Sequence, residues 1–138
     1  MWAIIRDCAR YAEYMPRLKK SSLVEAGVCH TELQMPFPLT NLWSDCSFEL
    51  SESPEGHFER TWKLVRGTYK RNSGRWRLIP WGEGRKQTLA VYNLDSDPKM
   101  AIPDGIIRAA QTGSLPDVFK AVRKRGVTMR AGGEPAQP

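Results

Sequence analysis

The sequence lacks long apolar runs. None of its 138 residues belongs to a stretch approaching the ~20 apolar residues that a membrane-spanning helix requires. No secretory signal opens it, because Arg6 and Asp7 bring charge too early. Its 10 prolines and 11 glycines are ordinary counts that exclude collagen-like and low-complexity chains. Length and composition therefore predict one globular domain with a sizeable core.

Cysteine is also scarce. The sequence has 3 cysteines, Cys8, Cys29 and Cys46, which are odd in number and far apart. They form neither a CxxC motif nor a zinc-binding spacing, which argues against a disulfide scaffold and a structural metal. We expect reduced, buried thiols in a cytoplasmic protein.

Motifs of catalysis are missing as well. There is no GxSxG, HExxH or P-loop sequence. The 2 histidines are His30 and His57, and His30 shares a predicted strand side with Glu32, as a base with its orienting carboxylate would. Because no nucleophile or ligand set accompanies them, a solvated strand face is the favoured interpretation. We predict no catalytic residue, no metal site and no cofactor.

The net charge of +6 is unevenly distributed. The charged residues within 21–62 are all acidic apart from Arg60, and those within 63–86 are all basic apart from Glu83. Opposite charges facing each other on adjacent strands would explain this pattern. The alternative is a basic face that attracts lipid headgroups or nucleic acid. Trp76 lies in phase with Leu78 and therefore points to the apolar side, which argues against base stacking and nucleic acid.

Period-two alternation dominates the middle of the chain. Trp2 to Tyr14 has the spacing of short helical segments, which end at Met15-Pro16. Alternating apolar and polar residues then predict strands separated by turns, one of them at Asn72-Ser73-Gly74. The predicted strands are 21–26, 28–35, 42–51, 57–66, 75–81 and 87–94.

The period changes near the C-terminus. Pro103 suits the first turn of a helix. Leu115, Val118, Phe119 and Val122 then form an i, i+3, i+4, i+7 stripe, which predicts a long helix of roughly residues 103–125 with these four side chains buried together. We expect a domain over residues 1–126 and a disordered tail over residues 127–138.

About six antiparallel strands followed by one amphipathic helix indicate an α+β fold, with the helix against the concave face of a curved sheet. A space between helix and sheet would be the default site for an apolar ligand. Arg60 and Arg66 are in phase with Trp62 and Leu64, and a buried arginine would need an anionic or carbonyl partner. The predicted lining consists of Phe48, Trp62, Leu64, Trp76, Leu78, Leu89 and Val91 from the strands and Ile106, Ala110 and Phe119 from the helix.

One set of residues, spread over almost the whole chain, carries a family resemblance: Trp2, Asp7, Tyr11, Tyr14-Met15-Pro16, Gly67, Asn72-Ser73-Gly74-Arg75-Trp76-Arg77-Leu78, Thr88, Tyr92, Pro103, Leu115-Pro116, Arg123 and Arg125. Together they resemble the START-like, helix-grip superfamily (SRPBCC proteins), within it the polyketide cyclase/dehydrase and coenzyme Q-binding branch. The resemblance implies a seven-stranded sheet around a C-terminal helix, enclosing a cavity for lipids, sterols, quinones or polyketides. The family's first strand precedes its first helix, where this sequence begins. We therefore expect either a missing edge strand or a start further upstream, which leaves export open.

These observations favour a carrier or chaperone that binds a hydrophobic small molecule without turnover. The alternative is a polyketide aromatase/cyclase-type enzyme of the same fold, in which polar groups of the cavity would move protons. Peripheral contact with an anionic membrane is a further expectation. It rests on the basic residues Lys120, Arg123, Lys124 and Arg125 near the predicted cavity mouth.

Overall fold

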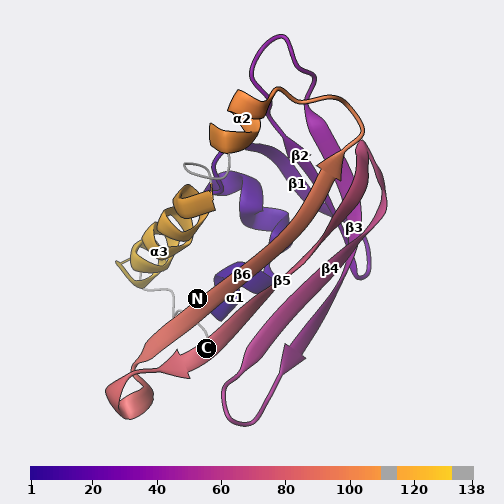
Figure 1. Cartoon of the computed structure of the whole chain (residues 1–138). Coiled ribbons are helices and arrows are strands. Elements are labelled where there is room, and N and C mark those ends of the chain that lie inside the picture. Colours follow the sequence, from indigo (N-terminus) through magenta and orange to yellow (C-terminus); the bar gives the residue numbers. More distant parts are fainter. Residues whose placement is uncertain (110–114, 132–138) are drawn as a thin grey trace.

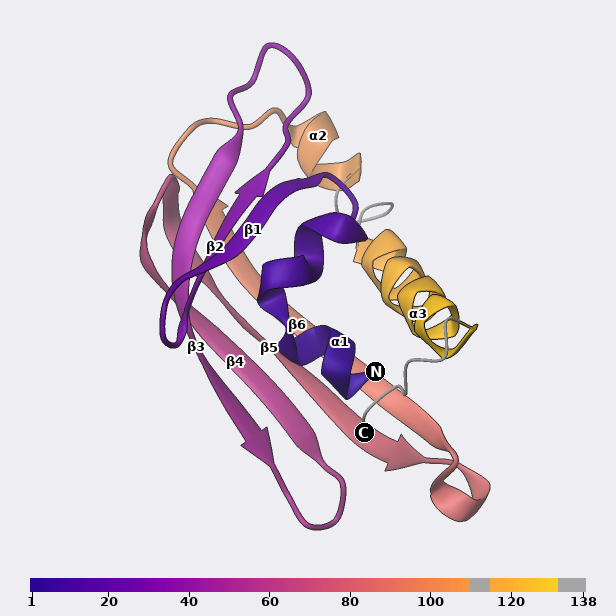
Figure 2. The same ribbon diagram turned by 180° about the vertical axis from the view of Figure 1, so that it is seen from behind.

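The computed structural model, which describes residues 1–109 and 115–131, contains a curved antiparallel sheet of six strands in sequence order. Helices α1, η1 (a 3₁₀ helix) and α3 lie on one side of this sheet (Figures 1 and 2). The strands are β1 (Leu18–Glu25), β2 (Val28–Leu33), β3 (Leu42–Glu52), β4 (Phe58–Gly67), β5 (Tyr69–Trp81) and β6 (Gln87–Pro98). The helices are α1 (Trp2–Arg6), η1 (Cys8–Glu13), η2 (Glu83–Arg85), α2 (Asp104–Ala109) and α3 (Leu115–Ala131). The predicted α+β class and number of strands are confirmed.

The turn predicted at Asn72-Ser73-Gly74 is wrong, because these residues lie inside β5. β4 ends at Gly67 and β5 begins at Tyr69, so the two strands are joined near Thr68 instead. Gly74 has a packing role: a side chain at this position would collide with the Trp62 ring on the neighbouring strand. Glycine inside a strand often marks such a close approach, which sequence alone does not distinguish from a turn.

The register of β5 and β6 defines the concave face. Trp76 and Leu78 are buried beneath the helices, and they pair directly with Tyr92 and Ala90. Directly opposed residues of an antiparallel pair point to the same face, so Tyr92 and Ala90 face the helices too. Leu89 and Val91, predicted to line the cavity, therefore lie on the convex face. Alternation had separated the two sides of β6 correctly but could not say which one faces inward.

The main core lies between α1, the sheet and the middle of α3. Trp2, Ile4 and Ile5 of α1 are buried against Trp76, Leu78 and Val122. The Trp2 ring stacks on Phe58 of β4 with 5.2 Å between centroids. The short N-terminal helix thus covers part of the concave face where the sequence predicted only the C-terminal helix (Figure 2).

A disulfide joins Cys8 of η1 to Cys29 of β2, with 6.5 Å between their Cα atoms. Cys46 is free and buried. The expectation of three reduced thiols is therefore wrong for two of them. Strand alternation places Cys29 on one side of β2 but does not show that η1 folds back across that side. The cysteines no longer support a cytoplasmic location.

The C-terminal helical region also differs from its prediction. α2 ends at Ala109 and α3 begins at Leu115, and the intervening residues, including Ala110, lie outside the described part of the chain. α3 continues to Ala131, so residues 127–131, predicted as disordered tail, are helical. The remainder of the predicted tail lies outside the described residues.

The side chains of α3 are buried to different extents. Val122 is buried, Gly126 lies against Ile4, and Arg125 forms a 2.7 Å ion pair with Glu13 of η1. Phe119, one turn earlier, is 39% exposed, which contradicts its predicted burial with Val122. The hydrophobic stripe correctly identified the inward side of α3: Val118 and Val122 pack against the core with α1, whereas the Phe119 ring is only partly covered.

Candidate ligand-binding site

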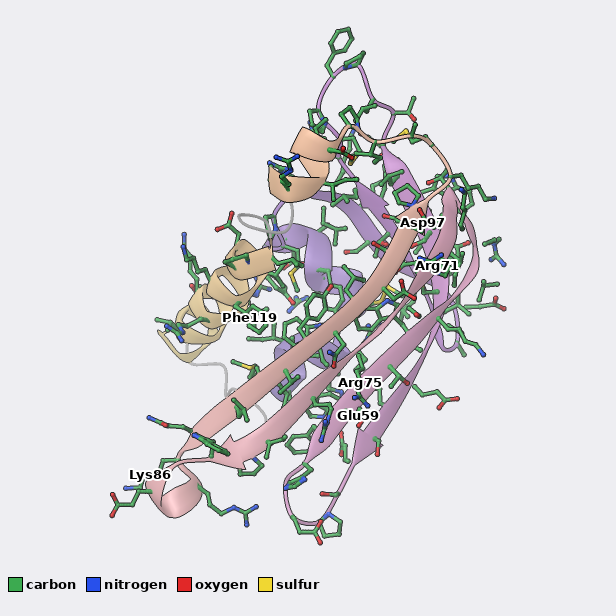
Figure 3. The ribbon with its side chains drawn as sticks, in the orientation of Figure 1. Glu59, Arg71, Arg75, Lys86, Asp97 and Phe119 are labelled. Carbon is green, nitrogen blue, oxygen red and sulfur yellow. A yellow bond between two sulfur atoms is a disulfide. The ribbon has the colours of Figure 1, made fainter. Side chains whose placement is uncertain are left out.

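A row of aromatic side chains runs across the concave face from α3 to β4. Phe119 contacts Trp76 and Tyr92 edge-on, at centroid distances of 5.4 Å and 6.3 Å. Tyr92 packs against Trp76 at 4.5 Å and stacks on Trp62 at 5.8 Å. Figure 3 shows Phe119 between α3 and the sheet. These rigid rings offer a large apolar contact area.

The outer end of this row opens to solvent beside α3. A depression of about 530 Å³ is lined by Leu115, Pro116, Phe119, Lys120 and Arg123. All five lining residues belong to α3, so this depression lies on the surface of the helix. Two cationic side chains thus lie beside the apolar residues of this depression.

Arg60 lies at the inner end of the same row. Its strand position pairs with Leu50 on β3 and with Trp76 on β5, so its side chain shares the concave face with Trp76. It is 5% exposed. The guanidinium carbon lies 4.7 Å from the centre of the Phe48 ring and 5.6 Å from that of Trp62.

The Tyr11 ring of η1 completes this enclosure, with its centre 5.5 Å from the same guanidinium carbon. Aromatic faces attract a cation, but they do not replace the oxygen acceptors that guanidinium N–H groups require. Among the described residues, nothing accepts a hydrogen bond from the buried Nε of Arg60. The concave face therefore contains a buried cation with a donor left unsatisfied.

The tyrosines around Arg60 are neutral at physiological pH. Burial raises the pKa of Tyr11 and of Tyr92 to about 12, and the charge of Arg60 opposes that rise. Burial also raises the pKa of Tyr14 strongly. The Tyr11 hydroxyl donates to the carbonyl of Ile5, and the Tyr14 hydroxyl donates to that of Ile4 at 3.2 Å. These phenols hold α1 in place and do not supply a base.

The other arginine considered from the sequence, Arg66, lies on the convex face. A register shift between Asp45 and Cys46 pairs Asp45 with Arg66 but Cys46 with Leu64, so the phase of β4 changes at this point. Arg66 binds Asp45 through a 2.8 Å ion pair. Alternation alone could not reveal the bulge that separates Arg66 from Arg60.

Neither histidine belongs to the concave face. His30 Nδ1 lies 2.6 Å from Asp45 Oδ1, so its carboxylate partner is Asp45 and not Glu32. Because neighbouring Cys29 faces η1, His30 points to the opposite side of β2. His57 is exposed between β3 and β4. No group of three or more His, Cys, Asp or Glu residues is arranged for metal binding within residues 1–109 and 115–131.

Several residues of the predicted lining meet around the aromatic row. Phe48, Trp62, Trp76 and Phe119 are connected by the ring and cation contacts described above, and Leu78 is buried beside them. Leu64 shares the side of Trp62 by alternation, and Ile106 is half-buried in α2. The sequence prediction missed Tyr92 and Tyr11. Tyr92 alternates with Leu89 and Val91, and an amphipathic tyrosine could have been assigned to the inner side.

The sheet, the N-terminal helices and the C-terminal helix define a START-like, helix-grip protein with a mainly aromatic concave face. The sequence profile of the family described as "Polyketide cyclase / dehydrase and lipid transport" matches residues 1–123. The chain belongs to this family. No curated protein has a significantly similar sequence.

Two solved structures illustrate the similarity of fold. A STAR-related lipid transfer protein fragment from Xanthomonas axonopodis superposes with a TM-score of 0.72 at 19% identity, over 90% of this chain and 76% of that one. A START superfamily protein from Mycobacterium smegmatis has a TM-score of 0.71 at 15% identity, over 92% of this chain and 87% of that one. In the described part of the present chain, no helix has the length and apolarity needed to cross a membrane.

Proposed function

We propose that this protein binds a hydrophobic small molecule between the concave face of its sheet and α3, and carries it without chemical turnover. The observation that carries this proposal is the aromatic row formed by Trp62, Trp76, Tyr92 and Phe119. One end of the row is covered by a helix whose own aromatic residue remains 39% exposed. An apolar ligand that displaces Phe119 would find a preformed aromatic surface. Lipid transport in the family description supports this function.

The alternative is a polyketide aromatase/cyclase-type enzyme, a chemistry also included in the family description. The observation in its favour is a charged residue, Arg60, on the concave face beside Tyr11. Proton transfer also needs a group that titrates near neutral pH. Burial raises the pKa of Tyr11 and of Tyr92 to about 12, so both stay protonated at neutral pH. Both histidines lie elsewhere. Binding without turnover is therefore the function that the geometry supports best.

The place of action follows from two features. The Cys8–Cys29 disulfide favours an oxidising compartment over the cytoplasmic location expected from the sequence. Lys120, Arg123 and Lys124 are exposed on α3 and would attract an anionic membrane at ~1 kcal/mol per residue. Arg125 does not belong to this group, because it pairs with Glu13. Co-sedimentation with vesicles tests this contact. The protein should sediment with anionic vesicles, less so at high salt, and should not sediment with neutral vesicles.

A neutral apolar probe tests the binding function. Methyl dodecanoate should quench or shift the tryptophan fluorescence, because Trp62 and Trp76 lie in the predicted site. Phe119→Glu should weaken binding about tenfold or more by placing a charge at the mouth of an apolar site. Val127→Glu, at a 60% exposed position of the same helix, is the matched control. Absence of a response from the parent protein to any apolar probe would overturn the carrier function.

A further inference from the structure

We propose that Arg60 binds the carboxylate of the ligand, so that the protein selects apolar molecules that end in a carboxylate group. This inference rests on the proposed carrier function, because it concerns the same concave face. It begins from the partners of Arg60. Three aromatic rings enclose the guanidinium group, and no described carboxylate lies within 4 Å of it.

A buried guanidinium group is costly unless both its charge and its N–H donors are satisfied. Phe48, Tyr11 and Trp62 partly stabilise the charge through their ring faces. The buried Nε–H still has no acceptor among the described residues. An oxyanion brought by the ligand would supply the opposite charge and the missing acceptor together.

The aromatic row gives the ligand a direction. Starting at the depression beside α3, contacts lead from Phe119 to Tyr92, from Tyr92 to Trp62, and from the Trp62 ring to Arg60. An apolar chain or ring system lying along this row has its far end at the guanidinium group. A terminal charged group would therefore meet Arg60, while the apolar body stays against the rings.

A carboxylate fits this position better than a phosphate does. The planar fork of a guanidinium group matches the two oxygens of a carboxylate, and the single charges balance. A phosphate brings additional charge that would need a second cation. Arg66 cannot serve as this cation, because it lies on the convex face and pairs with Asp45, and Arg125 is engaged by Glu13.

A matched pair of probes tests the inference. Dodecanoate and methyl dodecanoate share an apolar chain, and only the first carries a charge. Below micellar concentrations, tryptophan fluorescence should show dodecanoate binding about tenfold tighter or more, as expected for a charge-assisted hydrogen bond. Arg60→Met should reduce dodecanoate binding to the level of the ester. Arg60→Lys, which keeps the charge without the fork, should be intermediate.

Arg75→Met is the control, because Arg75 lies exposed on the convex face of the neighbouring strand (Figure 3). It should retain the full preference for dodecanoate. Equal binding of acid and ester by the parent protein, or a preference that survives in Arg60→Met, would overturn the role of Arg60 and leave the carrier function standing. Binding of neither probe would overturn both. Should Arg60→Met fail to fold, the acid-to-ester ratio of the parent protein decides the question.

Discussion

The sheet buries one charged residue on each face, and the two have different partners. Asp45 on β3 and Arg60 on β4 are each 5% exposed. Asp45 accepts from His30 at 2.6 Å and from Arg66 at 2.8 Å, so three strands are joined on the convex face. Arg60 contacts three aromatic rings and forms no ion pair among the described residues. Charge satisfied within the protein serves the fold, whereas charge left unsatisfied beside an apolar site is available to a ligand.

The largest expected effect on stability comes from removing the Cys8–Cys29 disulfide, which ties η1 and its Tyr11 ring to the sheet beside Arg60. Cys8→Ser combined with Cys29→Ser should lower the free energy of unfolding by about 3 kcal/mol, because the disulfide closes a loop with a sequence separation of 21. Urea denaturation would measure the loss. Hydrogen exchange should accelerate in η1, which carries Tyr11, while amides around Asp45 on the convex side stay protected. Unchanged stability after reduction of the parent protein would contradict this prediction.

Removing the buried acid should have the next largest effect. Asp45→Ala should cost about 2 kcal/mol of unfolding free energy, because it removes two charge-assisted hydrogen bonds. Asp95→Ala provides the comparison: its side chain is 62% exposed and it meets Arg71 at 3.4 Å. This exposed pair should contribute less than about 1 kcal/mol. Equal losses in the two variants would mean that Asp45 is not structurally special.

Arg60 should behave in the opposite way to Asp45. Without ligand, Arg60→Met should raise the free energy of unfolding by about 1 kcal/mol, since methionine fills similar space without burying an unpaired charge. Arg60→Lys should bring no such gain because it keeps the charge. Chemical denaturation of delipidated protein is the appropriate measurement. A clear destabilisation by Arg60→Met would show that Arg60 serves the fold as Asp45 does.

A pH titration tests how well the concave side excludes water. The pKa of Tyr11 and of Tyr92 rises from 10.0 to about 12 on folding. Their burial therefore contributes stability that is fully present below pH 10 and is lost as the pH rises from about 10 to about 12. Ultraviolet absorbance should show little phenolate near pH 10 in the folded protein. Four normally titrating tyrosines in the native state would contradict the described burial.

The sequence predicted the elements of this fold better than their orientation. Alternation located β3 and β4 nearly to the residue, and the stripe through Val122 identified the inward side of α3. Alternation assigns two sides to a strand without saying which side faces the core. For this reason the prediction placed Leu89 and Val91 on the inner side of β6, where the structure has Ala90 and Tyr92.

Features that depend on contacts between residues distant in the sequence could not be predicted from local sequence patterns. Nothing local in the sequence shows that Cys8 meets Cys29, or that Gly74 makes room for the Trp62 ring. Arg60 was recognised only as one of two arginines in phase with Trp62. The bulge that sends Arg66 to the other face became apparent from the strand register.

Native mass spectrometry of the protein purified from its natural host, without detergent, tests the central claim most directly. The account predicts that the parent protein retains an apolar carboxylic acid, with Arg75→Met as a control that retains it too. The Arg60→Met variant should lose this molecule or exchange it for neutral lipid. The same neutral molecule retained equally by all three proteins would contradict the role assigned to Arg60.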